Sequence, residues 1–148
     1  MFEDGQILYF DPFYFKNGNT AKAKYFVVLK VCDEQKCILA SLPTRKETIP
    51  RNEVIESGCL ELPEISLNCF VIAPDEVVTE CGKRFDFKTH LYGHQIDDYE
   101  SSVLRETYQI EGTDYFIWGK MEASIFKRLV DCFTNSTSVK RKFKRLLG

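Results

Sequence analysis

The sequence predicts a small, mainly β domain with one helix packed on its sheet near the C-terminal end. Two apolar runs, 25–31 and 37–42, flank a short polar link at 32–36. The first run is rich in β-branched and aromatic residues, which pack well on a pleated surface, and both runs are too short for an isolated helix. After Lys120 the apolar residues recur at helical spacing instead. An antiparallel hairpin at the centre of a sheet, followed by a helix, is therefore expected.

Length and charge limit the class of protein. The 148 residues fit one domain with a hydrophobic core. A net charge of -2 argues against binding of nucleic acid or membrane through overall charge. No apolar run approaches the roughly 20 residues that cross a bilayer, and the acidic start at 1–5 lacks the basic and apolar regions of a signal peptide. We expect a cytoplasmic protein with no membrane partner.

The cysteines show no pattern of a metal or redox motif. Six are scattered along the chain without a CxxC pair: Cys32, Cys37, Cys59, Cys69, Cys81 and Cys132. An even number permits disulfides, but a cytosolic chain of this size does not need them. Most have apolar neighbours, as buried thiols do. We therefore expect them to be small apolar residues of the core.

The first half of the chain reads as strands separated by turn residues. Residues 6–10 form a strand that Asp11-Pro12 ends. The polar stretch 16–23, with the turn signal Asn17-Gly18, forms a loop leading into the hairpin, and this basic loop is a candidate wall of a site. A solvated connection is the alternative. Residues 43–58 are polar and predict a long connection with little regular structure.

The second half mixes short strands with less regular sequence. Residues 68–73 predict a strand, 76–79 a short strand or turn, and the alternation over 84–91 a strand with one wet face. Residues 101–109 fit either a helical turn or a strand, and 115–118 are a short apolar run.

The C-terminal part divides at Asn135. Residues 120–133 predict the best helix of the chain, and Asn135 to Ser138 interrupt it and could cap a second short helix. We assign 1–134 to the β domain and 135–148 to a basic tail or short helix. The basic segment fits a phosphate-contacting tail, but a solvated helix end, whose cations complement the helix dipole, is the favoured interpretation.

Few residues point to chemistry. His90 and His94 have a spacing that could bind zinc on a helix, but Tyr92-Gly93 between them indicates a strand end, so neither a metal ion nor another cofactor is expected. Lys24 and Thr44 stand at the two ends of the hairpin, where a cation and a hydroxyl could face one phosphodiester. RNA would supply its own nucleophile, the 2′-OH. Ordinary surface residues at strand ends are the alternative.

Four segments together resemble the MazF/PemK family of toxin endoribonucleases. They are Gly5-Gln-Ile-Leu-Tyr-Phe-Asp11, Lys24-Tyr-Phe-Val-Val-Leu29, Ser41-Leu-Pro-Thr44 and, more weakly, the helix that opens with Gly119-Lys-Met-Glu. The resemblance implies an SH3-like small β-barrel, often a homodimer, that cleaves single-stranded RNA without metal and binds an antitoxin protein. The middle of the chain does not match, so 84–114 could be an insertion.

The resemblance also implies the site. It places Thr44 at the family's catalytic Ser/Thr and Lys24 at its catalytic Arg, and Tyr25 stands where the family has Pro. RNA-binding cations would come from the loop and from the end of the hairpin: Lys16, Lys22, Arg45 and Lys46. Two rival interpretations stay open. One is a non-catalytic binding module of the same fold that holds a protein partner or nucleic acid, and the other is an accessory globular domain without a site.

Overall fold

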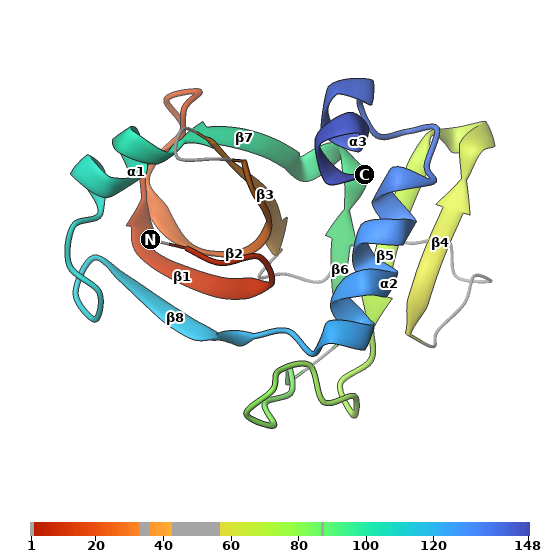
Figure 1. Cartoon of the computed structure of the whole chain (residues 1–148), viewed down its shortest axis with the longest axis horizontal. Helices are drawn as coiled ribbons and strands as arrows, with labels where there is room; N and C mark the ends of the chain where they lie inside the picture. The colour runs from red at the N-terminus through yellow and green to blue at the C-terminus, as the bar shows by residue number, and fades with distance from the viewer. Residues whose placement is uncertain (1, 33–35, 43–56, 87) are drawn as a thin grey trace.

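The computed structural model describes residues 2–32, 36–42, 57–86 and 88–148. Within these residues, eight strands form two antiparallel sheets, accompanied by three α-helices. The predicted mainly β class with a C-terminal helix is therefore confirmed. Figure 1 shows a strongly curved sheet on one side of the molecule and a smaller, flatter sheet, with a helix across it, on the other.

The curved sheet is built around the predicted hairpin. Its strands are, in spatial order, β7 (Ile96–Glu100), β3 (Lys36–Leu42), β2 (Lys22–Cys32), β1 (Gln6–Phe13) and β8 (Tyr115–Lys120). β2 and β3 pair antiparallel from Tyr25 opposite Leu42 to Cys32 opposite Lys36. Because β1 covers the other edge of β2, the hairpin lies at the centre of the sheet, as predicted.

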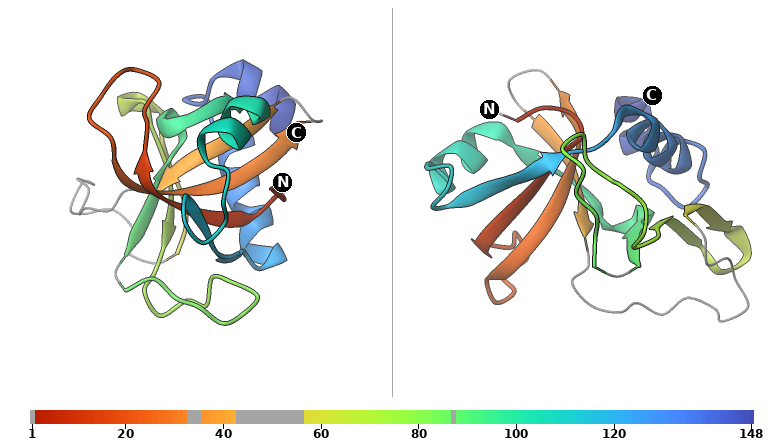
Figure 2. Two further views of the ribbon diagram at one scale, coloured as in Figure 1. Left: turned by 90° about the vertical axis from the view of Figure 1, so that its left-hand side faces the viewer. Right: turned by 90° about the horizontal axis from the view of Figure 1, so that it is seen from below.

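The second sheet and the helices come mostly from the later part of the chain. The sheet contains β4 (Gly58–Leu62), β5 (Leu67–Ile72) and β6 (Thr89–Tyr92). The α-helices are α1 (Ser101–Thr107), α2 (Ala123–Thr134) and α3 (Arg141–Leu147), and two 3-10 turns are η1 (Pro63–Ile65) and η2 (Gly93–Gln95). The right-hand view of Figure 2 shows α1 at one end of the molecule and α2 and α3 at the other.

Two hydrophobic cores lie on opposite faces of β2, because successive side chains of a strand point to opposite faces. Val27 and Leu29 belong to the core shared with α2 and the second sheet, whereas Phe26 and Val28 belong to a core shared with α1. Leu8, Phe10 and Phe13 of β1 extend this second core. One central strand thus serves both cores, which explains its nearly continuous apolar sequence.

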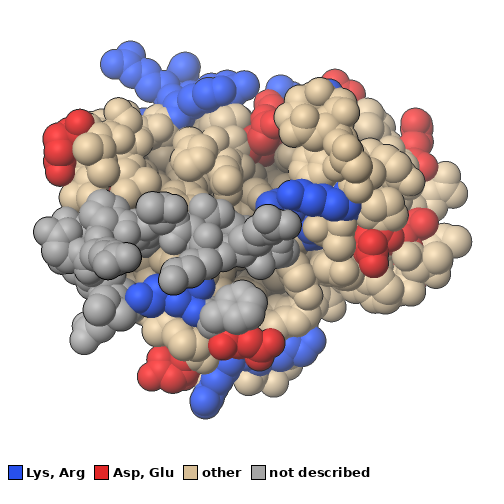
Figure 3. Space-filling view, turned by 180° about the vertical axis from the view of Figure 1, so that it is seen from behind, with Lys and Arg blue, Asp and Glu red and all other residues tan. Residues whose placement is uncertain are grey.

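The basic C-terminal segment is anchored by apolar residues. Val139, Phe143 and Leu147 are buried in the core shared with α2. Arg141, Lys142 and Arg145 of α3 are exposed, whereas Lys144 is half-buried and donates a hydrogen bond to the Ser136 carbonyl at 2.9 Å. Figure 3 shows Lys and Arg side chains at the upper edge of the molecule. Among the helices of the described residues, none has the length and apolar character needed to span a membrane.

Two elements differ from their predicted positions. β1 does not end at Asp11-Pro12 but continues to Phe13, with an irregular register between Phe10 and Phe13 that accommodates the proline. The alternation over 84–91 is not one strand, since β6 begins only at Thr89. Phe85 instead stacks on Trp118, with ring centroids 5.1 Å apart. The range 84–114, predicted as a possible insertion, contains β6 and β7, and each of these strands is part of a sheet.

A disulfide corrects the prediction that all six cysteines are apolar core residues. Cys59 of β4 and Cys132 of α2 are bonded, with their Cα atoms 5.4 Å apart. The cause is the packing of α2 across β4, a strand that the sequence pattern did not predict. Cys37 and Cys69 are buried, as predicted, whereas Cys81 is exposed.

Glu61 of β4 fastens the turn between α2 and α3. Its carboxylate accepts hydrogen bonds from the Ser136 hydroxyl at 2.8 Å, the Thr137 backbone N–H at 3.0 Å and the Asn68 side-chain amide at 3.0 Å. The residues expected to cap a second helix therefore bind Glu61, and α3 begins after Lys140 without a side-chain cap. Burial alone would raise the pKa of Glu61, but these hydrogen bonds together lower it.

Replacing Glu61 by glutamine is expected to lower the free energy of unfolding by about 1–2 kcal/mol at neutral pH, because charge-assisted hydrogen bonds are lost. A carboxyl whose pKa is lowered on folding stabilises the protein above its unfolded pKa, about 4.3. That contribution disappears as the pH falls through the folded value, so the difference between wild type and Glu61→Gln should shrink in acid. Urea unfolding at several pH values measures it, with exposed Glu64→Gln as the control. An equal difference at every pH would contradict the assignment.

Candidate functional site

A cavity of about 640 Å³ opens where the 15–20 loop, the hairpin and the β6–β7 connection meet. We call it the lysine cavity. Its cations are Lys22, Lys24 and Lys140, its other polar residues include Ser41, His94 and Gln95, and its aromatic residues are Phe15, Phe26 and Tyr99. The predicted loop and Lys24, the basic residue predicted at the start of the hairpin, therefore line the same cavity.

Strand periodicity explains how the hairpin lines this cavity. Lys22, Lys24 and Phe26 are two residues apart on β2, so their side chains share one face. Phe26 pairs with Ser41 of β3, which brings the hydroxyl to the same face. The neighbouring pair across β1 is Phe10 opposite Lys24. Two lysines and a hydroxyl thus converge through sheet register alone.

The other lining residues of the cavity come from parts of the chain that are distant from the hairpin in sequence. β7 pairs with β3 through Ala40 opposite Ile96, the residue that directly follows η2. This pairing places His94 and Gln95 among the residues that line the cavity. Lys140 reaches it from the residue before α3, because Val139 and Phe143 fix that segment in the core. No local pattern predicts this convergence, because it depends on pairing between residues far apart in the chain.

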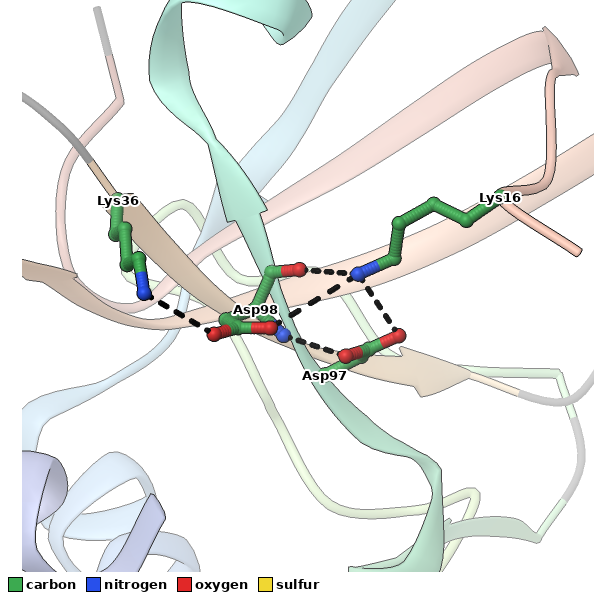
Figure 4. Close-up of polar contacts among 4 residues, drawn as sticks. All are labelled: Lys16, Lys36, Asp97 and Asp98. Atoms are coloured by element: carbon green, nitrogen blue, oxygen red, sulfur yellow. Dashed lines mark hydrogen bonds and ion pairs between the residues drawn. The ribbon is translucent and has the colours of Figure 1, made fainter. Parts of the chain in front are cut away.

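Lys16, a predicted RNA-binding residue, is held by two acidic partners on β7. Its ammonium lies 3.1 Å from a carboxylate oxygen of Asp97 and 3.9 Å from one of Asp98, and it sits 4.4 Å from the centre of the Tyr99 ring. Figure 4 shows Lys16 and Lys36 approaching Asp98 from opposite sides, with Asp97 beside it. Lys36 is 3.6 Å from Asp98. Together the four residues Lys16, Lys36, Asp97 and Asp98 form a cluster of ion pairs on β7, which we call the polar bar.

The electrostatics of the bar follow from burial and charge. Burial would raise the pKa of Asp98, but Lys142, Lys16 and Lys36 together lower it, so the carboxylate stays ionised. Burial, and then Asp97 and other neighbours, raise the pKa of Tyr99 above its usual range, so this ring stays a neutral phenol. Within the described residues, Lys22 and Lys140 form no ion pair. Their charges are therefore available to an anion that enters the cavity.

The predicted site residues fall into three groups. Lys22 and Lys24 line the lysine cavity, whereas Lys16 is not among its lining residues and is ion-paired with Asp97, which is. Thr44, Arg45 and Lys46 lie outside the described residues. Sequence reasoning missed Ser41, Gln95 and the role of Lys140 as a lining residue, and it weighed His94 only as a zinc ligand.

A second cavity, of about 520 Å³, lies on the other side of Tyr99. It is lined mainly by apolar and aromatic side chains: Phe13, Tyr14, Tyr99, Val103, Leu104 and Tyr108. Tyr14 and Val103 are unusually exposed for their types, at 59% and 53%. Lys16, Lys36 and Asp98 of the polar bar also border it, and Asp97 borders the lysine cavity, so the bar contributes residues to both.

Comparison with models of known protein families, with curated proteins and with solved structures found no match for this chain.

Proposed function

We propose that the protein is a metal-independent endoribonuclease of MazF/PemK type, which cleaves single-stranded RNA in the lysine cavity. The observation that carries the proposal is the convergence of Lys22, Lys24 and Lys140 around Ser41 in one cavity. Cations in a partly enclosed site attract the phosphate backbone and stabilise the charge that develops on phosphorus. Aromatic side chains in the same cavity offer surfaces on which unpaired bases can stack.

The proposed roles of Lys24 and Thr44 follow the resemblance, and those of the other cations follow their places in the 16–23 stretch and at the end of the hairpin. Lys24 and Arg45 hold the scissile phosphate, Thr44 assists the chemistry, and Lys22, Lys16 and Lys46 bind neighbouring phosphates. The 2′-oxygen attacks phosphorus, the bond from phosphorus to the 5′-oxygen breaks, and a cyclic phosphate and a 5′-hydroxyl result. The proposed fold is an SH3-like small barrel, which the strong curvature of the five-stranded sheet supports (Figure 1). A homodimer, an antitoxin partner and a cytoplasmic location belong to the same proposal.

The test is cleavage of end-labelled single-stranded RNA by purified protein in excess EDTA. Wild type is expected to make discrete cuts, and Thr44→Ala is expected to cut at least about 100-fold more slowly, as loss of one transition-state contact typically does. Exposed Thr113→Ala is the matched control and should cut like wild type. A folded wild-type protein that cuts none of a varied set of RNAs would rule out the enzyme. Equal cutting by Thr44→Ala would remove only Thr44 from the site.

A non-catalytic binding module is the second candidate. The apolar second cavity, with Tyr14 and Val103 exposed at its edge, favours it, because apolar surface of this kind serves protein contacts. On this alternative, Thr44→Ala would leave partner affinity unchanged and wild type would bind without cutting. Toxicity on expression in a bacterial host, relieved by Thr44→Ala, would favour the endoribonuclease instead.

A further inference from the structure

His94 is one of the residues that line the lysine cavity, in which cleavage is proposed. It is the middle residue of η2, between β6 and β7, and its exposed side chain lines the lysine cavity together with Lys24 and Ser41. Its ring lies beside that of Tyr92, with centroids 5.4 Å apart. His94 is therefore accessible to a ligand and is supported from one side by an aromatic ring.

Tight packing fixes the backbone that carries His94. A Cβ atom on the preceding residue, Gly93, would come within 2.5 Å of the Asn68 Oδ1 atom and 2.7 Å of a Val139 methyl group. Only glycine therefore lets η2 approach β5 and the segment before α3 this closely. On the following side, Ile96 is locked in register opposite Ala40. The turn that carries the imidazole is therefore held in place on both sides, and it ends opposite Ala40, the residue before Ser41.

Attack by a 2′-OH requires a group that takes up its proton. Among the described lining residues, the lysines offer only donors, since an ammonium has no lone pair. Asp97 is 3.1 Å from the Lys16 ammonium and accepts the Asp98 backbone N–H at 2.8 Å. Tyr99 stays a neutral phenol. A neutral imidazole has a lone pair on one ring nitrogen, which leaves His94 as the suitable acceptor.

We propose that His94 is the general base of RNA cleavage, an inference that rests on the proposed ribonuclease function. A ring nitrogen of His94 takes the proton of the 2′-OH as the 2′-oxygen bonds to phosphorus. The bond from phosphorus to the 5′-oxygen breaks, and the Lys24 ammonium gives a proton to that oxygen. Exchange with water then returns both side chains to their starting states. His90, the other histidine, lies on β6 and is not among the residues that line the cavity.

The test compares His94→Ala and His94→Asn with the matched control His90→Ala, in the same EDTA assay under single-turnover conditions. The His94 variants are expected to cleave about 10²–10⁴-fold more slowly, the usual contribution of a general base. His90→Ala should cleave like wild type. Added imidazole should restore part of the rate to His94→Ala, because the exposed site leaves room for it, and should not restore Thr44→Ala. Thermal melts establish that each variant is folded.

The outcomes separate the two proposals. Cleavage by both His94 variants at the wild-type rate, or a loss that imidazole does not restore, overturns the role of His94 and leaves the endoribonuclease intact. Absence of cleavage by folded wild type overturns the endoribonuclease and the role of His94 with it. Loss in both His94 variants, with rescue by imidazole and normal cleavage by His90→Ala, supports the inference.

Discussion

Replacement of Lys24 by glutamine is expected to lower the single-turnover rate of RNA cleavage by about 10²–10³-fold, as removal of one stabilising donor from an active site usually does. Glutamine keeps much of the length of the side chain and removes the charge. Lys24 lies on the middle strand of the sheet, opposite Phe10 and two residues from buried Phe26. Its position is therefore set by sheet register, and few other arrangements could replace its proposed contact with the phosphate.

The proper control lies on the same strand. Lys30 pairs with Ile38 near the other end of β2 and is not among the lining residues of the lysine cavity. Lys30→Gln changes the net charge equally, so any general electrostatic effect on RNA binding appears in both variants. If Lys24→Gln and Lys30→Gln cleave RNA at the same rate, Lys24 does not contact the phosphodiester that is cleaved.

Lys24→Arg sharpens the experiment. Arginine offers a planar fork of donors to phosphate, whereas lysine offers a point charge. The resemblance places an arginine at this position, so Lys24→Arg is expected to cleave at least as fast as wild type. Salt titration of RNA binding gives a separate readout, since each lost phosphate contact should reduce the slope of log affinity against log salt by about 0.7 for a single strand. Lys24→Gln should show that reduction and Lys24→Arg should not.

The parts of the fold that were predictable have strong local patterns. The hairpin follows from two dense apolar runs around a polar link, and α2 from apolar residues at helical spacing. β4 was missed because its residues, 58–62, carry no alternation that stands out and depend on β5 and α2 for burial. The alternation before Thr89 does not mark a strand, because Phe85 packs by stacking on Trp118 and β6 begins only at Thr89.

The candidate site divides in the same way. Lys24 was predicted from its place at the start of the hairpin and from the resemblance, and Lys22 from the basic stretch 16–23, which was expected to be a loop. The structure places both residues on β2 and in the lining of the lysine cavity. His94 and Lys140 enter the cavity only because β7 pairs with β3 and α3 is buried beside α2. Such contacts join residues far apart in sequence, and neither a motif nor a period marks them. Burial of Phe143 and Leu147 likewise depends on a neighbour that the local sequence does not reveal.

Reduction of the bond between Cys59 and Cys132 is expected to lower the free energy of unfolding by about 4–5 kcal/mol, the chain-entropy estimate for a loop of this size. The two residues are 73 positions apart, so the bond closes a long loop and strongly restricts the unfolded chain. In the folded protein, α2 should stay on the sheet after reduction, because buried Leu129 and Phe133 pack it into the core. Disulfides persist in oxidising compartments, so the compartment decides whether the protein has the stability of its oxidised form or of its reduced form.

Urea unfolding with and without reductant measures this contribution. Wild type should lose stability on reduction, Cys59→Ser should be insensitive to reductant, and Cys81→Ser, which removes an exposed thiol outside the disulfide, should behave like wild type. The slope of the unfolding free energy against urea adds a test of the cause. A cross-linked unfolded chain is more compact and exposes less surface, so the slope should rise on reduction. Lower stability with an unchanged slope would instead place the effect in the folded state, in the contact between α2 and β4.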